Sequence, residues 1–383
     1  MKYFIPTYEQ CLDICDKNGN LIFYETKHVV DSYNISIFNY RLAFYKNFLD
    51  PLNDGGSINA NEMRGICFVF NTDGTLFKRY ILMDKFWNIN QVECSMYKNL
   101  KDKEIDNVYI KEDGSIISFI KLPNGKIFAK SKASFISEQS DLAMEILSKN
   151  DNLYKFVNYV LDKDLVPIFE LVSPKNRIVI KYDSDDLILL RVRNSNTGEY
   201  LDISQFNSFG ISLANKVDLS LDDMISMKST IEGIEGWVVQ FKDGKLIKVK
   251  TNWYFNLHSL FTEDLNRENC LIDLIINEKI DDVVSQLGDS DMIKVVDDLS
   301  NKINLYIVEY KDSVENLIKK YNGDIVSFSK ENSKDKYFPI AIQVIRGKDI
   351  ITLIKEHILR STSRLQLARD FIKKLNMKYD KEK

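Results

Sequence analysis

The eight residues Val108–Ser115 read VYIKEDGS, and this stretch carries the motif around which the fold is organised. Its apolar beginning, residues 108–110, predicts a β-strand, because β-branched and aromatic residues favour a pleated, half-buried surface. Lys111 stands where this strand ends, and Gly114 follows within a turn. Glycine has no Cβ, so the backbone at Gly114 can turn tightly and approach a ligand closely. The stretch therefore predicts an amine held at the edge of a ligand site.

Apolar runs separated by glycine-containing turns predict a β-rich region of the α+β class on both sides of this motif. Three hairpins are expected, with strands at residues 65–70 and 75–80, 115–121 and 126–130, and 236–241 and 245–250. A further hairpin is expected from residues 177–182 and 187–193 around an acidic turn. Single strands are expected at 21–26 and 167–172, and helices at 8–16, 138–149 and 152–163. The expected sheets are antiparallel, because tight turns join successive strands.

Beyond residue 255 the apolar residues recur with helical spacing. Ile276, Ile280 and Val283 mark one helix, and the apolar positions between Leu305 and Ile318 mark others. We therefore place a domain boundary near residue 255. Residues 1–255 are expected to form antiparallel sheets with flanking helices, and residues 256–383 a smaller all-α C-terminal domain.

The composition excludes several classes of protein. The 383 residues include 44% hydrophobic and 28% charged residues, and the formal net charge is −4. These values are typical of a globular chain and exclude a polycationic arm, so a nucleic-acid site would have to be a local basic surface. No stretch approaches the roughly 18 apolar residues of a membrane span, and the N-terminus lacks the apolar core of a signal peptide. The five scattered cysteines predict reduced thiols in the cytoplasm.

Two common kinds of site are absent from the sequence. The histidines His28, His258 and His357 lie far apart and lack the spacing of a metal site, and Cys11 and Cys15 have no second pair to complete a zinc site. No Gly-x-x-x-x-Gly-Lys-Ser/Thr loop occurs. Nucleotide binding would therefore use another mode.

Charged residues recur on the strands after Lys111. Glu170 lies between two apolar residues, so the period of two in a strand points its carboxylate away from them. Glu235 opens a strand, and Lys248 and Lys250 project from one face of the next. Each of these residues alone is equally a solvated surface residue. Together they supply the cations and carboxylates that a lysine nucleophile, a triphosphate and a metal ion require.

This order of motifs resembles that of the covalent nucleotidyltransferase superfamily, which comprises DNA ligases, RNA ligases and mRNA capping enzymes. Within it the chain is most similar to the family typified by the RNA ligase 1 of bacteriophage T4, a tRNA-repair ligase. The resemblance runs from about residue 35 to 260, and the stretches that carry it include Met63–Ile66, Asp84–Asn88, Lys111–Ser115, Lys130–Lys132, Phe169–Glu170, Thr197–Tyr200, Glu235–Gly236 and Lys248–Tyr254. The helical remainder matches far more loosely.

The resemblance implies a role for each matching residue. Lys111 would be the catalytic residue and would form lysyl-AMP. Arg64 and Lys85 would contact the phosphates of ATP, while Lys248 and Lys250 would bind the α-phosphate and its transition state. The other residues implied in nucleotide binding are Tyr40, Glu112, Gly114, Lys132, Glu170 and Glu235.

The resemblance also implies Mg²⁺, for which Mn²⁺ could substitute. Its ligands would be Glu170, Glu235 and, in the helical domain, Asp281 and Asp282. Adjacent residues on a helix point about 100° apart, so the two aspartates cannot easily share one ion. The helix geometry therefore favours a solvated face over a metal site for these two residues.

The activity implied by the resemblance is ATP-dependent RNA ligation in three steps. Lys111 would become adenylylated with loss of pyrophosphate, AMP would pass to an RNA 5′-phosphate, and an RNA 3′-hydroxyl would then attack and release AMP. The partner would be single-stranded RNA or a tRNA cut in its anticodon loop, with the helical domain contributing RNA or tRNA specificity. A monomer in the cytoplasm is expected, which would be the host cytoplasm if the chain is encoded by a phage.

Two alternatives remain at this point. The first is another lysine nucleotidyltransferase, a DNA ligase or a capping guanylyltransferase, which would usually carry an OB-fold where this chain has helical spacing. The second is a non-catalytic RNA-binding protein of the same fold, which would be signalled by loss of Lys111, Glu235 or Lys250. All three residues are present.

Overall fold

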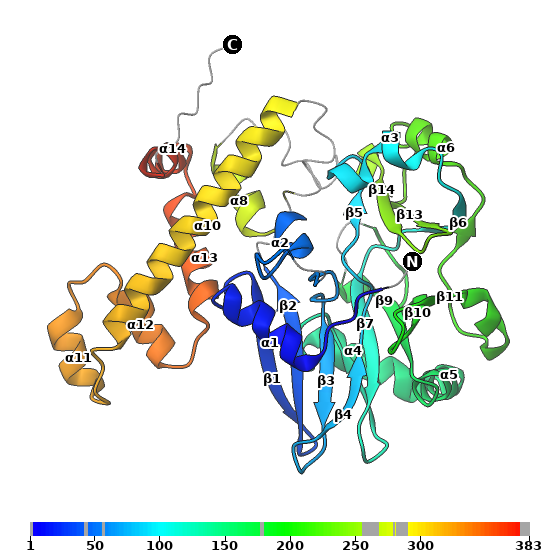
Figure 1. The fold of residues 1–383 in the computed structure, drawn as a ribbon, viewed down its shortest axis with the longest axis horizontal. Coiled ribbons are helices and arrows are strands. Elements are labelled where there is room, and N and C mark those ends of the chain that lie inside the picture. The colour runs from blue at the N-terminus through cyan, green and yellow to red at the C-terminus, as the bar shows by residue number, and fades with distance from the viewer. Residues whose placement is uncertain are drawn as a thin grey trace. The chain divides into compact units, whose positions relative to one another are not determined.

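The computed structural model describes residues 3–41, 45–55, 58–176, 180–254, 268–278, 280 and 290–375. The chain divides into two compact units, Met1–His258 and Ser259–Lys383, and each is described by itself (Figure 1). Neither contains, among these residues, a helix long and apolar enough to cross a lipid bilayer. All five cysteines lie in the described part, and none forms a disulfide, as expected.

The first sheet of unit 1 is an antiparallel meander in the order β1-β2-β3-β4. Its strands are β1 (Phe23–Val30), β2 (Tyr33–Tyr40), β3 (Ile66–Phe70) and β4 (Leu76–Tyr80). Helix α1 (Tyr8–Lys17) begins at a capping box in which Thr7 and Gln10 bond each other's backbone, and it buries Cys11, Ile14 and Cys15. These side chains share a core with the short helix α2 (Tyr45–Leu49) through Phe48.

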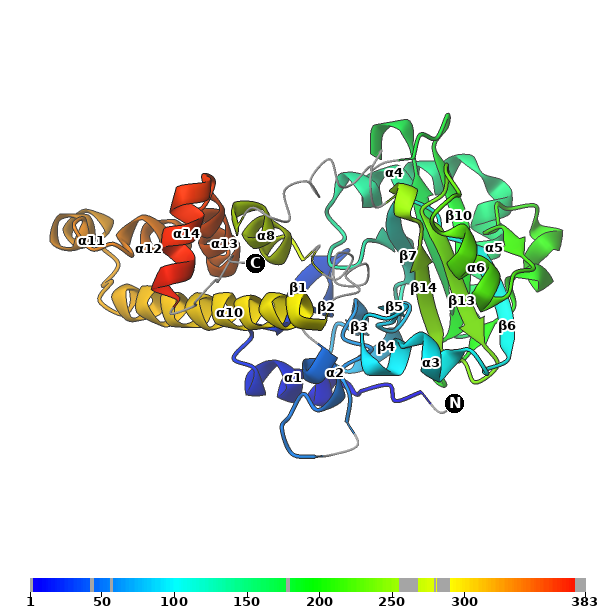
Figure 2. The same cartoon turned by 90° about the horizontal axis from the view of Figure 1, so that it is seen from above.

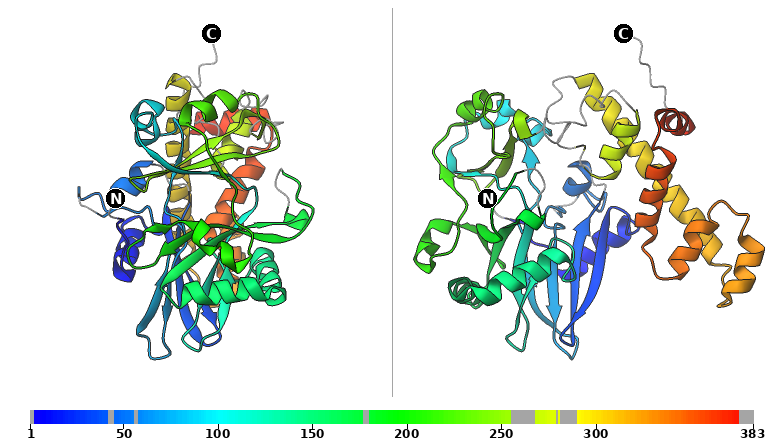
Figure 3. Two further views of the ribbon diagram at one scale, coloured as in Figure 1. Left: turned by 90° about the vertical axis from the view of Figure 1, so that its right-hand side faces the viewer. Right: turned by 180° about the vertical axis from the view of Figure 1, so that it is seen from behind.

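The second sheet is antiparallel in the order β11-β10-β9-β7-β8. Its strands are β7 (Ser115–Lys121), β8 (Ile127–Lys130), β9 (Leu165–Val172), β10 (Asp186–Asn194) and β11 (Tyr200–Leu201). The central strand β9 is buried at every residue. Helices α4 (Glu138–Lys149) and α5 (Asp151–Leu161) pack on this sheet (Figure 3). Phe156 of α5 contacts Phe169 of β9 there.

The third sheet has the order β12-β6-β13-β14-β5 and holds the strand that precedes Lys111. Its strands are β5 (Trp87–Asn88), β6 (Ile105–Ile110), β12 (Lys216–Val217), β13 (Gly236–Phe241) and β14 (Leu246–Lys250). Only the β5–β14 pair is parallel. Helices α3 (Tyr97–Leu100) and α6 (Leu221–Met227) lie beside it (Figure 2). Leu221 and Met224 of α6 share its core.

The expected α+β class and the three glycine-turn hairpins are confirmed, but the expected hairpin from 177–182 and 187–193 is wrong. Strand β10 pairs instead with β9 and β11, Leu187 lying opposite Leu171. Residues 180–182 are not in a strand, and residues 177–179 lie outside the described part. The apolar side chains of β10 are buried against the central strand β9. By contrast, the backbone N–H of Ile180 and the hydroxyl of Tyr182 make hydrogen bonds with Asp113 in the turn after β6.

Unit 2 is helical throughout its described residues, as expected. Its helices are α8 (Glu268–Ile276), α10 (Ser290–Ile318), α11 (Ile325–Asn332), α12 (Phe338–Ile345), α13 (Ile350–Ser361) and α14 (Leu365–Lys374). The apolar positions from Leu305 to Ile318, expected to mark several helices, belong to the single 29-residue helix α10. The side chains of Asp324 and Asp349 cap the N-termini of α11 and α13.

Candidate active site

Lys111 is one end of a chain of three charges whose central member is Glu235. Nζ of Lys111 is 2.6 Å from Oε2 of Glu235, and Nζ of Lys250 is 3.0 Å from Oε1 of the same carboxylate. Glu235 is 4% exposed at its side chain, Lys250 11% and Lys111 23%, so Lys111 is the member most open to a ligand. One carboxylate thus bridges two ammonium groups.

The third sheet brings these three residues together although they are far apart in sequence. Gly236 lies opposite Lys250, and Trp237 opposite Ile110, the last residue of β6. The backbone N–H of Lys111 donates to the carbonyl of Gly236 at 2.9 Å, which extends the ladder by one residue. The nucleophile candidate is therefore fixed to the strand that follows Glu235.

Two glycines permit close approach of the strands around this site. A Cβ at Gly114 would lie 2.2 Å from the carbonyl oxygen of Leu171, and a Cβ at Gly236 would lie 2.1 Å from that of Val249. Gly236 also adopts a φ of 150°, which side chains rarely adopt. Any larger residue at either position would push the turn or the strand away from its neighbour.

Glu170 faces the turn from β9. Its Oε1 accepts the N–H of Gly114 at 3.1 Å, and the side chain is buried. Burial raises the pKa of Glu170 to about 7. The positive charges of Lys111 and Arg64 and the hydrogen bond from Gly114 oppose this rise, and the negative charge of Glu235 adds to it. The carboxylate thus lies within electrostatic reach of Lys111, Glu235 and Arg64.

Asp113 has a structural role in the turn that its place in the motif did not reveal. It is buried, its Oδ1 accepts the hydroxyl of Tyr254 at 2.8 Å, and its Oδ2 accepts the N–H of Ile180 at 2.7 Å. Its own N–H donates to the hydroxyl of Tyr182 at 3.1 Å. The carboxylate of Glu112 accepts the hydroxyl of the same tyrosine at 2.8 Å.

The remaining cations predicted from the sequence lie over aromatic rings. Nζ of Lys85 is 4.4 Å from the ring centre of Trp87 and 5.2 Å from that of Tyr40, and Nζ of Lys132 is 4.9 Å from the same centre of Tyr40. Cation–π contacts of this kind hold an ammonium group in place while leaving its charge able to bind an anion. The structure therefore brings Tyr40, Lys85 and Lys132 together.

A second ring joins another pair of predicted cations. The guanidinium carbon of Arg64 is 5.8 Å from the ring centre of Phe86, and Nζ of Lys248 is 5.5 Å from it. Nη1 of Arg64 also donates to the carbonyl of Met83 at 3.2 Å. Since Arg64 acts on the pKa of Glu170, this pair belongs to the same site as Lys111.

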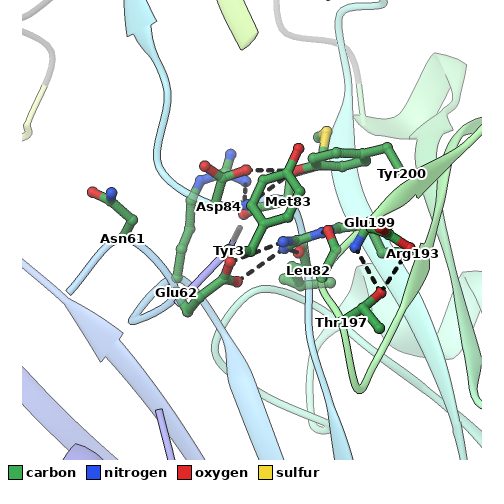
Figure 4. Close-up of polar contacts among 12 residues, drawn as sticks. Tyr3, Asn61, Glu62, Leu82, Met83, Asp84, Arg193, Thr197, Glu199 and Tyr200 are labelled. Carbon is green, nitrogen blue, oxygen red and sulfur yellow. Dashed lines mark hydrogen bonds and ion pairs between the residues drawn. The ribbon is translucent and has the colours of Figure 1, made fainter. Parts of the chain in front are cut away.

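A buried ion pair that the sequence did not reveal anchors the segments bearing Arg64 and Lys85 (Figure 4). Arg193 of β10 donates two bonds of 2.9 Å to Glu62, a third to the carbonyl of Leu82 and a fourth of 2.9 Å to that of Gly198. Burial disfavours the charge of Arg193, but the Glu62 carboxylate outweighs this and raises the pKa of the guanidinium.

The same network holds the segment before Lys85. The hydroxyl of Tyr200 donates to Asp84 at 2.5 Å, and the N–H of Lys85 donates to the carbonyl of Asn61 at 2.8 Å. Residues 61–64 and 82–85 are thus tied to each other and to β10. A lone glutamate and a strand arginine 131 residues apart give no sequence signal of their own.

The carboxylates of this site fit a divalent cation that arrives with phosphate groups. Mg²⁺ is usually held by one or two carboxylates together with substrate phosphates and waters. Glu170 and Glu235 offer two such carboxylates beside Lys111, but the described residues contain no group of three or more His, Cys, Asp and Glu side chains that could hold an ion alone. Asp281 and Asp282, the other predicted ligands, lie outside the described residues.

Comparison with known proteins gives one family. The family described as RNA ligase matches residues 62–259, which is just over half of the chain. The chain belongs to the RNA ligase family. The matched residues include every strand that surrounds Lys111. The predicted site residues Arg64, Lys85, Glu170 and Glu235 also lie within the matched range.

Two named relatives agree with this family. The chain is 29% identical over 254 residues to "Putative RNA ligase" of Thermovibrio ammonificans, covering 64% of each chain. It is 26% identical over 293 residues to "Putative bifunctional polynucleotide kinase/RNA ligase" of Autographa californica nuclear polyhedrosis virus, covering 71% of this chain and 40% of that one. The chain thus spans less than two thirds of the length of either relative.

Among solved structures, an archaeal ATP-dependent RNA ligase is 11% identical with a TM-score of 0.46, over 76% of each chain. This likeness is too low to add to the assignment.

Proposed function

We propose that this member of the RNA ligase family is an ATP-dependent RNA ligase that works through lysyl-AMP on Lys111. The observation that carries the proposal is the chain Lys111–Glu235–Lys250, in which the more exposed of the two amines, Lys111, lies at a glycine turn. A lysine nucleophile needs this arrangement, because its reaction develops negative charge on a phosphate.

In the first step the amine of Lys111 attacks the α-phosphorus of ATP. A nitrogen–phosphorus bond forms, the bond from the α-phosphorus to its bridging oxygen breaks, and pyrophosphate leaves. The ammonium group must first lose a proton to solvent, because a protonated amine has no lone pair with which to attack. Lys250 then remains beside the α-phosphate to balance its charge.

The other charged residues divide the phosphates between them. Arg64 and Lys248, beside the Phe86 ring, and Lys85 and Lys132, beside Tyr40, would hold the triphosphate. Glu170 and Glu235 would hold Mg²⁺ together with those phosphates. The metal would supply further charge neutralisation at the phosphates.

AMP would then pass to the 5′-phosphate of an RNA, and the 3′-hydroxyl of a second RNA end would displace it. Residues 1–255 would perform this chemistry, and the helical residues 256–383 would contribute to choice of RNA, with a cut tRNA as the first substrate to try. A cytoplasmic location and a monomeric state complete the proposal.

The test is incubation with α-labelled ATP and Mg²⁺ in the absence of RNA, followed by denaturing electrophoresis. Label that stays on the protein and is lost in Lys111→Ala is the expected result. Lys103→Ala is the matched control, because Lys103 pairs with Asp243 just before the same strand but outside the site. It should label normally.

Other outcomes would redirect the assignment. Label from GTP but not ATP would indicate a capping-type enzyme. No label from either, with protein shown by mass to carry no AMP, would favour a non-catalytic RNA-binding protein. Sealing of nicked DNA in preference to 5′-phosphorylated RNA would indicate a DNA ligase.

A further inference from the structure

Tyr182 bonds the turn that carries Lys111, although nothing in the motif series points to it. It lies in the connection between β9 and β10, and its hydroxyl makes two hydrogen bonds to consecutive residues. The oxygen accepts the N–H of Asp113 at 3.1 Å, and the hydroxyl donates to Oε2 of Glu112 at 2.8 Å. One side chain thus fixes both the backbone and a carboxylate of the turn.

One further polar anchor of this turn comes from the same connection, where the N–H of Ile180 bonds Asp113, and others come from different elements. The N–H of Lys111 bonds Gly236 of β13, the N–H of Gly114 bonds Glu170 of β9, and the carboxylate of Asp113 bonds Tyr254. Tyr182 is the group that holds the peptide between Glu112 and Asp113. Loss of its hydroxyl would leave a donor beside the buried Asp113 without its partner, which is costly away from water.

The carboxylate of Glu112 matters because of its position beside the nucleophile. Lys111 and Glu235 both act on the pKa of Glu112, which burial raises, so the three charges are close. Even so, Nζ of Lys111 pairs with Glu235 and contacts only the backbone oxygen of Glu112, at 3.4 Å. The Glu112 side chain is instead turned to Tyr182.

We propose that Tyr182 is a positioning residue for lysine adenylylation: it holds the turn and keeps the Glu112 carboxylate bonded away from the Lys111 ammonium. This inference rests on the proposed function. Burial raises the pKa of Tyr182 above its ordinary value, so the hydroxyl stays a donor to Glu112 across the working range of pH. Without it, Glu112 would become a second carboxylate able to pair with Lys111 and would delay its deprotonation.

The three-step reaction offers a readout that separates positioning from general stability. Only adenylylation uses the free amine of Lys111; sealing of a chemically pre-adenylylated RNA does not. Tyr182→Phe should therefore slow labelling by ATP by about ten- to a hundredfold, the range expected from losing a hydrogen bond to a charged group. Its sealing of pre-adenylylated RNA should stay within about twofold of the parent.

Tyr80→Phe is the matched control. The hydroxyl of Tyr80 also makes one donated and one accepted bond, to the carbonyl and N–H of Lys121, at 2.6 and 3.1 Å. That pair lies in the sheet core away from Lys111, so both reactions should fall together or not at all. Thermal unfolding of the two variants shows whether they lose similar stability.

A double variant tests the part played by Glu112. If its carboxylate competes for Lys111, then Glu112→Gln/Tyr182→Phe should label faster than Tyr182→Phe. Labelling of Tyr182→Phe at the parent rate, or equal loss of labelling and sealing, would overturn the inference while leaving the proposed function intact. Absence of label in the parent chain would overturn both.

Discussion

Breaking the buried pair of Glu62 and Arg193 should destabilise unit 1 far more than an ordinary substitution. Arg193 is fully buried, Glu62 is 3% exposed, and the guanidinium makes four hydrogen bonds to three residues. In Arg193→Met the carboxylate of Glu62 would be stranded in the core. Removal of one partner of such a pair costs about 3–5 kcal/mol of unfolding free energy.

The assay is urea unfolding followed by circular dichroism, with thermal unfolding alongside. For a unit of this size each kcal/mol lowers the Tm by about 2–4 °C, so a loss of roughly 6–20 °C is expected. Arg360→Met is the matched control, since Arg360 pairs with Glu356 on the surface at 77% exposure. Exposed pairs of this kind contribute about 0–1 kcal/mol.

The stranded carboxylate also predicts a sign for the effect of pH. Burial raises the pKa of Glu62, so without Arg193 the side chain can relieve its charge by taking a proton. The deficit of Arg193→Met should therefore be smaller at pH 5 than at pH 8, and Glu62→Leu/Arg193→Met should be more stable than Arg193→Met alone. A deficit below about 1 kcal/mol, or a double variant no better than the single one, would refute the argument.

Three further predictions follow from individual groups. Burial lowers the pKa of Lys130 to about 8 from 10.5, so its buried charge reduces stability below pH 8, and this cost fades as pH rises to 10.5. In urea unfolding, Lys130→Met should therefore raise the free energy of unfolding by about 2 kcal/mol at pH 7 and by little at pH 10.5. A lower free energy of unfolding at pH 7 would contradict this. For Glu170 the effect of pH on stability is the opposite. Its pKa is about 7 against an ordinary 4.5, so the nucleotide-free protein loses stability as pH rises between these values. Glu170→Gln should therefore stabilise the protein at pH 8, leave its stability unchanged at pH 4.5, and abolish labelling by ATP. Gly114→Ala should cut labelling by at least about tenfold, because the added Cβ would lie 2.2 Å from the Leu171 carbonyl oxygen. Gly125→Ala is the control: its Cβ would meet open space but its φ is +86°, so the variant should lose stability and still label. Equal labelling of the two variants would show that the close approach at Gly114 is unimportant.

Local pattern was sufficient to predict several elements of this chain. The hairpins with glycine turns at residues 71–74, 122–125 and 242–244 form where expected, because side-chain alternation and turn residues act within a few positions. Lys111 and Gly114 were likewise readable, since their chemistry is contained in one tetrapeptide. The helical character after residue 255 followed from the spacing of apolar residues alone.

The sequence did not predict which strands and which charged residues would pair when they are far apart along the chain. The hairpin expected around residues 183–186 fails because β10 buries its apolar side chains against β9, leaving Tyr182 to bond the turn after β6. Lys111 and Glu235 are 124 residues apart, and Glu62 and Arg193 are 131 apart. Periodicity in the sequence determines which face of a strand is apolar. The pairing of charged residues depends instead on which strands are buried together, because strand pairing is decided by the free energy of packing the whole unit.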